Sequence, residues 1–413
     1  MRIVYLTQRL PHGDGETFIV PEIEALLGAG HDVLVVPRQS DDPVLHDDVD
    51  AILARTRRLP GRLTIAAAAA AALARRPGAV AASYWRLRAT RPHRRALFNA
   101  LATAEGAWLA GLARTWRADH IHAHWAHFTA TMAMGASAAS GIPWSFTAHR
   151  YDVVLNNLLD EKLRSARFGR FIAGPMLELA RRLVGPEAAA RALVLHMGVR
   201  LPANPATPAP RGTAVLLCPA RLVPVKGHGV LLESAAGLAA RGVPFRLDLA
   251  GAGPEADALT LRIRDLNLGQ HVRMLGRVPH AELLRRYRDG EVDGVVLPSL
   301  DLGGGLHEGL SVALVEAMSY GIPAVSTATG GLSELLDGAG LLVPPGRSDE
   351  LAEALFELLG SPIRRSELGR AARQRIAEQF DVTVIARELV RLFAGEPPSP
   401  RPLQRPALSA LAG

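Results

Sequence analysis

The chain has 413 residues and a net charge of +7, and its 48% hydrophobic and 21% charged residues are typical of a folded protein with room for two domains. Its single cysteine, Cys218, excludes an internal disulfide framework and favours a reducing compartment. The longest apolar run, residues 63–74, is shorter than the roughly 20 residues that a membrane-spanning helix needs.

The first half of the chain alternates strands and helices. Strands rich in Val, Leu and Ile that are separated by helices indicate a parallel sheet covered on both faces. The elements predicted for this half are a strand over 3–8, a helix over 17–28, strands over 31–38 and 119–125, a helix over 128–140, a strand over 142–149 and a short strand within 191–199.

Between these elements lies an alanine- and arginine-rich region, residues 59–117, that helix propensity predicts to be largely helical, with breaks at Pro77 and Pro92. Residues 55–117 contain thirteen arginines, no lysine and a single acid, Glu105, which gives this stretch a net charge of +12. The rest of the chain is therefore acidic. Such clustering is typical of a surface that meets a polyanion.

Three interpretations of the basic region remain open: a solvated helical face, a nucleic-acid site, or a surface that docks on an anionic membrane. No recognised nucleic-acid motif accompanies the charge, so we expect no nucleic-acid partner. We favour the membrane, because arginines can bind anionic headgroups while Trp85, Leu87 and Trp108 enter the interface.

Three histidines at the end of strand 119–125 raise the possibility of a metal site. His122 and His124 lie on one face of the strand, and His127 is within a turn of them. Together they could bind zinc or iron, as in a metal-dependent hydrolase. Only Asp119 is available nearby as an acidic ligand, so we expect no metal here.

Residues 201–212 contain four prolines and predict a linker between two halves. The second half repeats the alternation and ends in a helix over 382–393 and a proline-rich tail, 397–413, that we expect to be disordered. Because ligands of such sheets bind at the carboxyl ends of the strands, we expect the site in a cleft between the halves. The strands predicted for the second half are 214–220, 245–251, 272–277, 294–299, 322–327 and 340–345.

The most specific signal follows the fourth of these strands, after a loop of three glycines. We expect a helix to begin directly after Glu308, so that the backbone N–H groups of Gly309, Leu310 and Ser311 are the unpaired donors of its first turn. Such a terminus binds phosphate well. Glu316 lies eight residues after Glu308, a little over two turns, so we expect the two carboxylates on nearly the same helical face.

This segment resembles the Glu-x7-Glu signature of the retaining glycosyltransferases of glycosyltransferase family 4, which have the GT-B fold. Residues 219–227 are similar to the G-R-L-x-x-x-K-G element of that family, with Ala220 in place of the usual glycine. The resemblance implies that Arg221 and Lys226 bind the diphosphate of a nucleotide-sugar donor. Two cations at a strand end can neutralise a diphosphate and stabilise it as a leaving group.

The same resemblance implies roles for the two acids and for further loops of the second half. Glu308 is expected to orient the transferred sugar, and Glu316 to hold the ribose. The remaining donor-side residues that it implies are Gly251 and Gly253 in a G-x-G-P loop, Arg277 and Val278 with their backbone at the nucleobase, and Gly330 and Gly331 beside the sugar or phosphate.

In the first half, the strand end at His149 resembles the active-site histidine segment of the family. The resemblance implies that His149 faces the transferred sugar in a positioning role, and that His124 and Trp125 line the acceptor side. Residues 16–18 replace a glycine pair of the family, and residues 196–200 depart from its Asn-Gly-Val-Asp pattern. Both departures resemble exopolysaccharide-assembly members such as colanic acid transferases.

The resemblance thus implies an α/β protein of GT-B architecture, with two Rossmann-like doubly wound domains that face each other across a cleft. The expected domains are residues 1–200 with a crossover helix, 381–396, and residues 201–380. The implied reaction is retaining transfer, without metal or other cofactor, from a UDP- or GDP-sugar to a lipid-linked or glycan acceptor. No leader peptide opens the chain, so we expect a cytoplasmic protein, peripheral on the inner face of the plasma membrane. A non-catalytic nucleotide-sugar-binding assembly subunit and a metal-dependent hydrolase remain alternatives.

Overall fold

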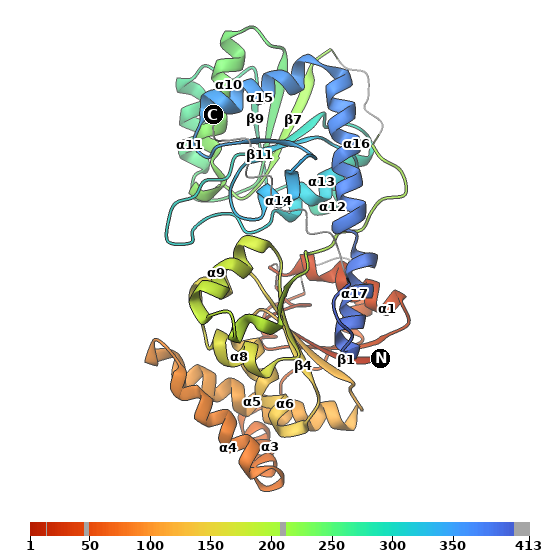
Figure 1. Cartoon of the computed structure of the whole chain (residues 1–413). Helices are drawn as coiled ribbons and strands as arrows, with labels where there is room; N and C mark the ends of the chain where they lie inside the picture. The colour runs from red at the N-terminus through yellow and green to blue at the C-terminus, as the bar shows by residue number, and fades with distance from the viewer. Residues whose placement is uncertain (14, 45–48, 207–211, 400–413) are drawn as a thin grey trace. The chain divides into compact units, whose positions relative to one another are not determined.

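The structure is a computed structural model that describes residues 1–13, 15–44, 49–206 and 212–399. The described residues divide into two compact units, one formed by residues 1–196 and 382–399, the other by residues 197–381. Figure 1 shows both units as layers of helices around a sheet. Part of the predicted linker and nearly all of the predicted tail lie outside the described residues.

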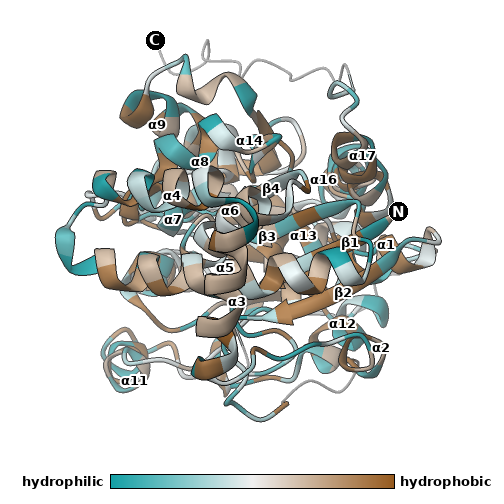
Figure 2. Cartoon of the chain, turned by 90° about the horizontal axis from the view of Figure 1, so that it is seen from below, coloured by the Kyte–Doolittle hydropathy of each residue, from teal (hydrophilic) through white to brown (hydrophobic). Residues whose placement is uncertain are grey.

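The first unit contains a parallel six-stranded sheet with the order β2-β1-β3-β4-β5-β6. Strands β3 and β4 are buried along their whole length, and β1 is buried after its first residue. Strand β1 is largely apolar, as is the edge strand β2, which is brown in Figure 2. Strand β3 instead carries three buried histidines. The strands are β1 (Arg2–Thr7), β2 (Asp32–Pro37), β3 (His120–His124), β4 (Trp144–Ala148), β5 (Phe168–Phe171) and β6 (Ala192–Val194).

Helices surround this sheet, and the basic region forms α3, α4 and α5, with the breaks that the two prolines predict. The C-terminal helix α17 packs against α1, and its Ile385, Leu389 and Phe393 belong to the hydrophobic core of this unit. None of the helices in the described ranges is both long enough and apolar enough to cross a membrane. The helices are α1 (Val20–Gly28), α2 (Asp50–Leu53), α3 (Arg62–Arg75), α4 (Pro77–Arg86), α5 (Ala96–Thr115), α6 (Phe128–Ser140), α7 (Arg150–Leu155), α8 (Leu159–Ser165), α9 (Gly174–Val184) and α17 (Val382–Ala394).

Strand β5 is absent from the sequence prediction. It is only four residues long, and its third residue, Arg170, is charged, so it lacks the apolar run that identifies the other strands. Arg170 is nevertheless completely buried, because its guanidinium pairs with the equally buried carboxylate of Glu22. A buried charge that finds its partner through the fold leaves no local sequence signal.

The second unit contains a parallel six-stranded sheet with the order β9-β8-β7-β10-β11-β12, and all six predicted strands are present. In sequence order this is 3-2-1-4-5-6, the order of the Rossmann fold. The elements are β7 (Ala214–Pro219), α10 (His228–Ala240), β8 (Phe245–Ala250), α11 (Ala256–Asp265), β9 (Val272–Gly276), α12 (His280–Arg288), β10 (Gly294–Leu297), α13 (Val312–Ser319), β11 (Ala324–Thr327), α14 (Leu332–Leu336), β12 (Leu341–Val343), α15 (Ser348–Gly360) and α16 (Pro362–Gln379).

The strand order reverses direction within each sheet, between β1 and β3 in the first unit and between β7 and β10 in the second. Loops that leave the carboxyl ends of two such strands diverge to opposite faces, which opens a crevice for a ligand. The predicted site residues Lys226 and Glu308 follow β7 and β10, and His124 is the last residue of β3.

Gly227 allows the loops after β7 and β10 to lie against each other. Its φ is +70°, and a Cβ atom at this position would lie 1.9 Å from the carbonyl oxygen of Pro298. The backbone N–H of Leu300 also donates to the carbonyl oxygen of Val225 at 2.8 Å. Only glycine meets both demands, the left-handed backbone and the close approach.

We therefore expect Gly227→Ala to lower the free energy of unfolding by at least about 2 kcal/mol, because the left-handed backbone and the steric clash both oppose a side chain. Gly229, two residues on in α10, has no positive φ, and a Cβ atom there would meet no other atom of the described residues within 4 Å. Gly229→Ala should leave stability unchanged or raise it slightly. Thermal unfolding followed by circular dichroism compares the two variants, and equal midpoints would refute the steric argument.

Candidate functional site

Lys226 and Glu308 meet at the point of the second sheet where the strand order reverses. The ammonium group of Lys226 donates to Oε2 of Glu308, and the two side chains are only 15% and 13% exposed. The carboxylate thus holds the cation at the strand ends. The structure therefore brings together two of the residues that the sequence predicts to act on the donor.

Arg221 lies on the same loop, after β7, and its side chain is exposed. Among residues 1–13, 15–44, 49–206 and 212–399, it has neither a hydrogen-bonding partner nor an ion-pair partner for its guanidinium. A guanidinium presents up to five N–H donors in a planar fork that matches phosphate. Within the described residues, the loop after β7 therefore offers one cation paired with a carboxylate and one available to an anionic ligand.

The predicted start of the helix that follows Glu308 is wrong. Helix α13 begins at Val312 and not at Gly309, and Ser311 is its N-cap, with a side-chain oxygen that accepts the N–H of Leu314 at 3.4 Å. Serine is a preferred capping residue because its hydroxyl satisfies an N–H of the first turn. Gly309, Leu310 and Ser311 thus precede the first turn, and its donors start at Val312.

The predicted helical relation between the two acids is wrong for the same reason. Glu308 lies before the helix, so the distance of eight residues to Glu316 does not place them on one helical face. Glu308 is held instead by the turn after β11. A Cβ atom on Gly330 would lie 1.9 Å from the carbonyl oxygen of Glu308, and the N–H of Gly331 donates to the carbonyl of Gly309 at 2.7 Å.

Gly251 and Gly253 have a structural reason to be glycine. A Cβ atom on Gly251 would lie 1.9 Å from the carbonyl oxygen of Ala220, and one on Gly253 would lie 2.3 Å from that of Leu222. The loop after β8 therefore packs directly on the loop that contains Arg221. A contact of these glycines with the donor itself stays a prediction.

Glu316 lies beside the segment that the sequence predicts to meet the nucleobase. Its Oε1 is 2.8 Å from Nε2 of His280, the first residue of α12. His280 follows Arg277 and Val278 by two to three residues, so the predicted ribose-binding and base-binding residues are neighbours in space. The hydrogen bond to Glu316 raises the pKa of His280 above its usual 6.5.

In the first unit, His124 and His149 meet although they come from the ends of different strands. Their Nε2 atoms are 2.7 Å apart, and the rings of His149 and Trp125 lie 4.4 Å apart between centroids. Burial, reinforced by the charge of Arg170, lowers the pKa of His149 to about 3. The imidazole that the family resemblance places near the sugar is therefore neutral at physiological pH.

Glu16 is a site residue whose role the sequence motifs do not reveal. Its buried carboxylate accepts three consecutive backbone N–H groups after β1, those of Gln8 (3.1 Å), Arg9 (2.6 Å) and Leu10 (2.7 Å). It also accepts the indole N–H of Trp125. Consecutive backbone N–H groups form an anion-binding nest, and here a carboxylate of the chain itself occupies the nest. The only sign of this role in the sequence is that Glu16 stands in the segment that replaces a glycine pair of the family.

Lys162 is a second residue that the motifs miss, and it is one of only two lysines in the chain, the other being Lys226. It is fully buried, and its ammonium donates to the carbonyls of Ala126 (3.0 Å), His127 (2.7 Å) and Asn157 (2.6 Å). Three donors on one nitrogen match three convergent carbonyls, which a planar guanidinium cannot do. Lys162 therefore anchors the turn that follows His124 and Trp125.

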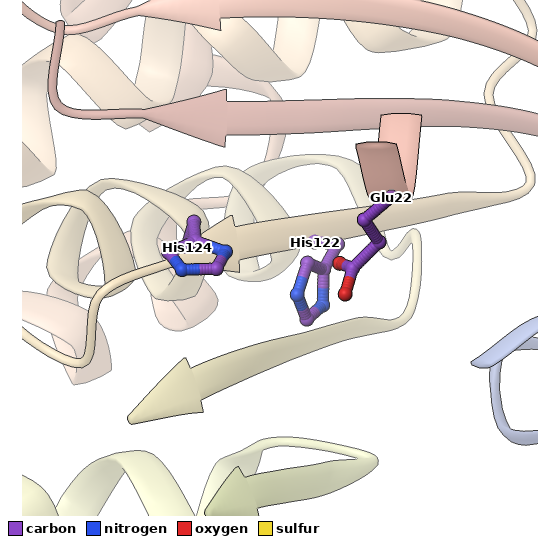
Figure 3. Close-up of side chains that lie close together, drawn as sticks. All are labelled: Glu22, His122 and His124. Carbon is purple, nitrogen blue, oxygen red and sulfur yellow. The ribbon is translucent and has the colours of Figure 1, made fainter. Parts of the chain in front are cut away.

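The possible metal site of His122, His124 and His127 is not assembled in the described structure, and the acidic neighbour of the histidines is Glu22 from α1 rather than Asp119. Potential ligand atoms of Glu22, His122 and His124 lie within 4.8 Å of one another, and His127 is not part of this group in the described structure (Figure 3). All three side chains are buried. Glu22 is already bonded to Arg170 (2.6 Å) and to the hydroxyl of Tyr5 (2.6 Å). A donor set whose carboxylate pairs with a guanidinium does not suit a cation, and metal independence stays a prediction.

Comparison with known proteins agrees with the sequence motifs. Residues 203–375 match the family model described as Glycosyl transferases group 1. The chain is 31% identical over 187 residues to the GDP-mannose-dependent monoacylated alpha-(1-6)-phosphatidylinositol monomannoside mannosyltransferase of Corynebacterium glutamicum, covering 45% of this chain and 48% of that protein. It is 36% identical over 190 residues to the putative colanic acid biosynthesis glycosyltransferase WcaL of Escherichia coli, covering 45% and 46%. The chain thus spans about half the length of these relatives.

Solved structures show the fold over nearly the whole chain. The structure of Anabaena HepE in complex with UDP has a TM-score of 0.66 and 18% identity, and it covers 95% of this chain and 100% of its own. The expected GT-B architecture of two Rossmann-like units is confirmed. A cleft between the units stays a prediction.

We expect the pKa of His280, measured by NMR titration, to lie above 6.5 and to fall in Glu316→Gln, because the neutral amide no longer stabilises the protonated ring. Since the hydrogen bond raises the pKa in the folded state, the pair stabilises the fold fully below pH 6.5 and loses that effect as the pH rises through the raised pKa. Glu353 provides a control, because its side chain is 69% exposed and pairs with Arg241, so Glu353→Gln should leave the titration of His280 unchanged. A normal pKa in the unsubstituted protein would contradict the observed hydrogen bond.

Proposed function

We propose that the chain is a retaining glycosyltransferase that moves a sugar from a UDP- or GDP-sugar to a lipid-linked or glycan acceptor. The main support is the paired Lys226 and Glu308 at the carboxyl ends of β7 and β10, on loops that also present the exposed Arg221. This is where a Rossmann sheet binds a nucleotide. The family match over residues 203–375 and the UDP-bound neighbour support the same class of donor.

In the proposed reaction, Arg221 and Lys226 neutralise the donor diphosphate, and the first-turn N–H groups of α13 add dipolar stabilisation. The anomeric carbon exchanges its bond to the diphosphate oxygen for a bond to the acceptor hydroxyl oxygen, on the same face of the sugar. The hydroxyl proton leaves with the diphosphate. Glu308 orients both the sugar and the ammonium of Lys226, while Glu316 holds the ribose.

Substitution of the ion pair tests this assignment. We expect Lys226→Ala and Glu308→Ala each to lower the rate of transfer at least about 100-fold, because preorganised charges at a leaving group have effects of this size. Arg262 provides a matched control, since it is an exposed cation of the same unit that pairs with Glu233 at 3.1 Å. Arg262→Ala should retain activity.

A panel of UDP- and GDP-sugars, with release of the nucleoside diphosphate as the signal, measures these rates. Unchanged melting temperatures would show that the variants are folded. Normal turnover in either variant of the ion pair would remove the assignment. Donor binding without turnover in the unsubstituted protein, with a full set of acceptors, would favour a non-catalytic binding subunit.

We also propose that the basic region docks on anionic membrane at the inner face of the plasma membrane. Of the three side chains predicted to enter the interface, Trp85 is 68% accessible, whereas Leu87 is buried and Trp108 is only partly exposed. Leu63 and Leu97 are exposed in this region instead, at 88% and 67%. The guanidinium of Arg88 lies 3.9 Å from the centroid of the Trp85 ring. Arginines beside exposed aromatic and aliphatic side chains are typical of helices that lie in a membrane interface.

A cavity of about 270 Å³ near the start of α5 and α6 suits the acceptor in this proposal. It combines cations with aromatic rings, and none of its described lining residues is acidic, so a phosphate attached to an apolar chain or a sugar would complement it. The lining residues are Arg94, Arg95, Phe98, His127, Phe128, Tyr151 and Leu155.

The double variant Trp85→Ala/Arg88→Gln should bind vesicles of phosphatidylcholine with phosphatidylglycerol at least about fivefold more weakly, since each arginine near an anionic surface contributes about 1 kcal/mol. Leu261→Ala/Arg262→Gln is the matched control, because Leu261 is 57% exposed on α11 of the other unit. Co-sedimentation measures the binding. Equal binding to vesicles of phosphatidylcholine alone would refute the electrostatic docking.

A further inference from the structure

A continuous chain of hydrogen bonds connects His149 to a buried ion pair in the first unit. Nε2 of His149 is 2.7 Å from Nε2 of His124, and Nδ1 of His124 is 3.0 Å from the hydroxyl of Tyr5. The Tyr5 hydroxyl is 2.6 Å from Oε1 of Glu22, and Oε2 of Glu22 is 2.6 Å from Nη1 of Arg170. The strands β1, β3 and β5, the helix α1 and the turn after β4 contribute one residue each to this chain.

The ion pair of Arg170 and Glu22, at the inner end of this series of hydrogen bonds, has a defined charge state. Arg170 is a guanidinium, and it donates to Glu22 and to the backbone carbonyls of Leu195 and His196. Both Arg170 and Glu22 are completely buried. A carboxylate that faces a buried guanidinium is ionised and can only accept hydrogen bonds. The hydrogen of the Tyr5 hydroxyl therefore points to Glu22.

The direction of every later hydrogen bond follows from that first one. Because the Tyr5 hydroxyl donates to Glu22, its oxygen can only accept from Nδ1 of His124, which must hold a hydrogen. Burial lowers the pKa of His124 well below its usual value, so the ring is neutral and its Nε2 has none. His149 must then donate from its own Nε2, which leaves its Nδ1 as an acceptor.

The backbone around His149 is fixed independently of its ring. His149 is the N-cap of α7, and the Asp152 carboxylate accepts its backbone N–H at 3.0 Å. The N–H of Asp152 donates in turn to the carbonyl oxygen of His149 at 3.1 Å. His122 does not compete, because its two nitrogens face the hydroxyls of Ser145 and Thr147.

We infer that Tyr5, Glu22 and Arg170 are positioning residues that hold His124 in its Nδ1–H tautomer and His149 in its neutral Nε2–H tautomer. The benefit for catalysis rests on the proposed function. A neutral His149 places no positive charge beside the sugar ring, which becomes electron-poor during transfer. The tautomers themselves do not depend on any activity. They are a property of the folded first unit.

The tautomers can be read by ¹⁵N–¹H NMR of the full chain with labelled histidine, because protonated and bare ring nitrogens have well-separated shifts. We expect Nδ1–H for His124 and Nε2–H for His149 in the unsubstituted protein. Tyr5→Phe removes the acceptor for Nδ1–H, so the other tautomer of His124 should become populated and the contact with His149 should weaken. Tyr84→Phe, in α4, is the control and should change neither ring. A different tautomer in the unsubstituted protein, or no change in Tyr5→Phe, overturns the inference.

Glu22→Gln provides a sharper test and a second variant should Tyr5→Phe fail to fold. The amide oxygen of glutamine would accept from Arg170, and its NH₂ group would donate to the Tyr5 oxygen. The hydroxyl hydrogen of Tyr5 would then turn towards His124, which should invert to its Nε2–H tautomer. An unchanged His124 tautomer in a folded Glu22→Gln protein contradicts the inference.

Transfer kinetics separate this inference from the proposed function. If both hold, Tyr5→Phe should lower kcat about tenfold or more while the KM for the donor changes less, because a misplaced ring disturbs the reacting geometry more than the binding of the nucleotide. The predicted tautomers without any transfer would refute the proposed function alone. If transfer occurs but the tautomers of His124 and His149 do not change in Tyr5→Phe, the positioning role alone is refuted.

Discussion

Parallel strands that run side by side bring their carboxyl ends to one edge of the sheet, and the reversal of strand order spreads the loops that follow. In the second unit this occurs between β7 and β10, and the loops are locked together where Gly227 meets Pro298. Lys226, next to Gly227 in the sequence, donates to Glu308, which lies in the loop after β10. In the first unit the reversal lies between β1 and β3, where Glu16, His124 and Trp125 gather.

The ion pairs Lys226–Glu308 and Arg170–Glu22 differ in their access to water, and this difference suits different tasks. Lys226 and Glu308 remain 15% and 13% exposed, so a ligand phosphate can reach the cation and take part of its hydrogen bonding. Arg170 and Glu22 have no exposure, and their separation would leave uncompensated charge in the protein interior. Lys226 and Glu308 can therefore exchange partners. Arg170 and Glu22 stay paired, and they fix the direction of the hydrogen bonds made by the groups bonded to them.

The fold could be predicted well where the signal in the sequence is local. Runs of Val, Leu and Ile identify all six strands of the second unit, and Pro77 and Pro92 mark the breaks in the basic helices. The start of α13 is misplaced because the serine that caps it follows a glycine-rich loop, and the phosphate-binding pattern alone does not show where the backbone becomes helical. Residues that act through distant contacts escape prediction. Glu22 bonds to a residue 148 positions further along the chain, and Arg170 looks like a break in a strand until that partner is known.

Helix α17 lies in the core of the first unit, although the whole second unit separates it in sequence from the other elements of that core. The core cluster that α17 shares with Ile3, Tyr5 and Ile23 therefore stays incomplete during synthesis until residue 393 has been added. Domains of most proteins fold in the order of their synthesis, but the first unit here cannot complete its core before the second unit has been made. A nascent chain that stops within the second unit lacks α17 and leaves part of that core exposed.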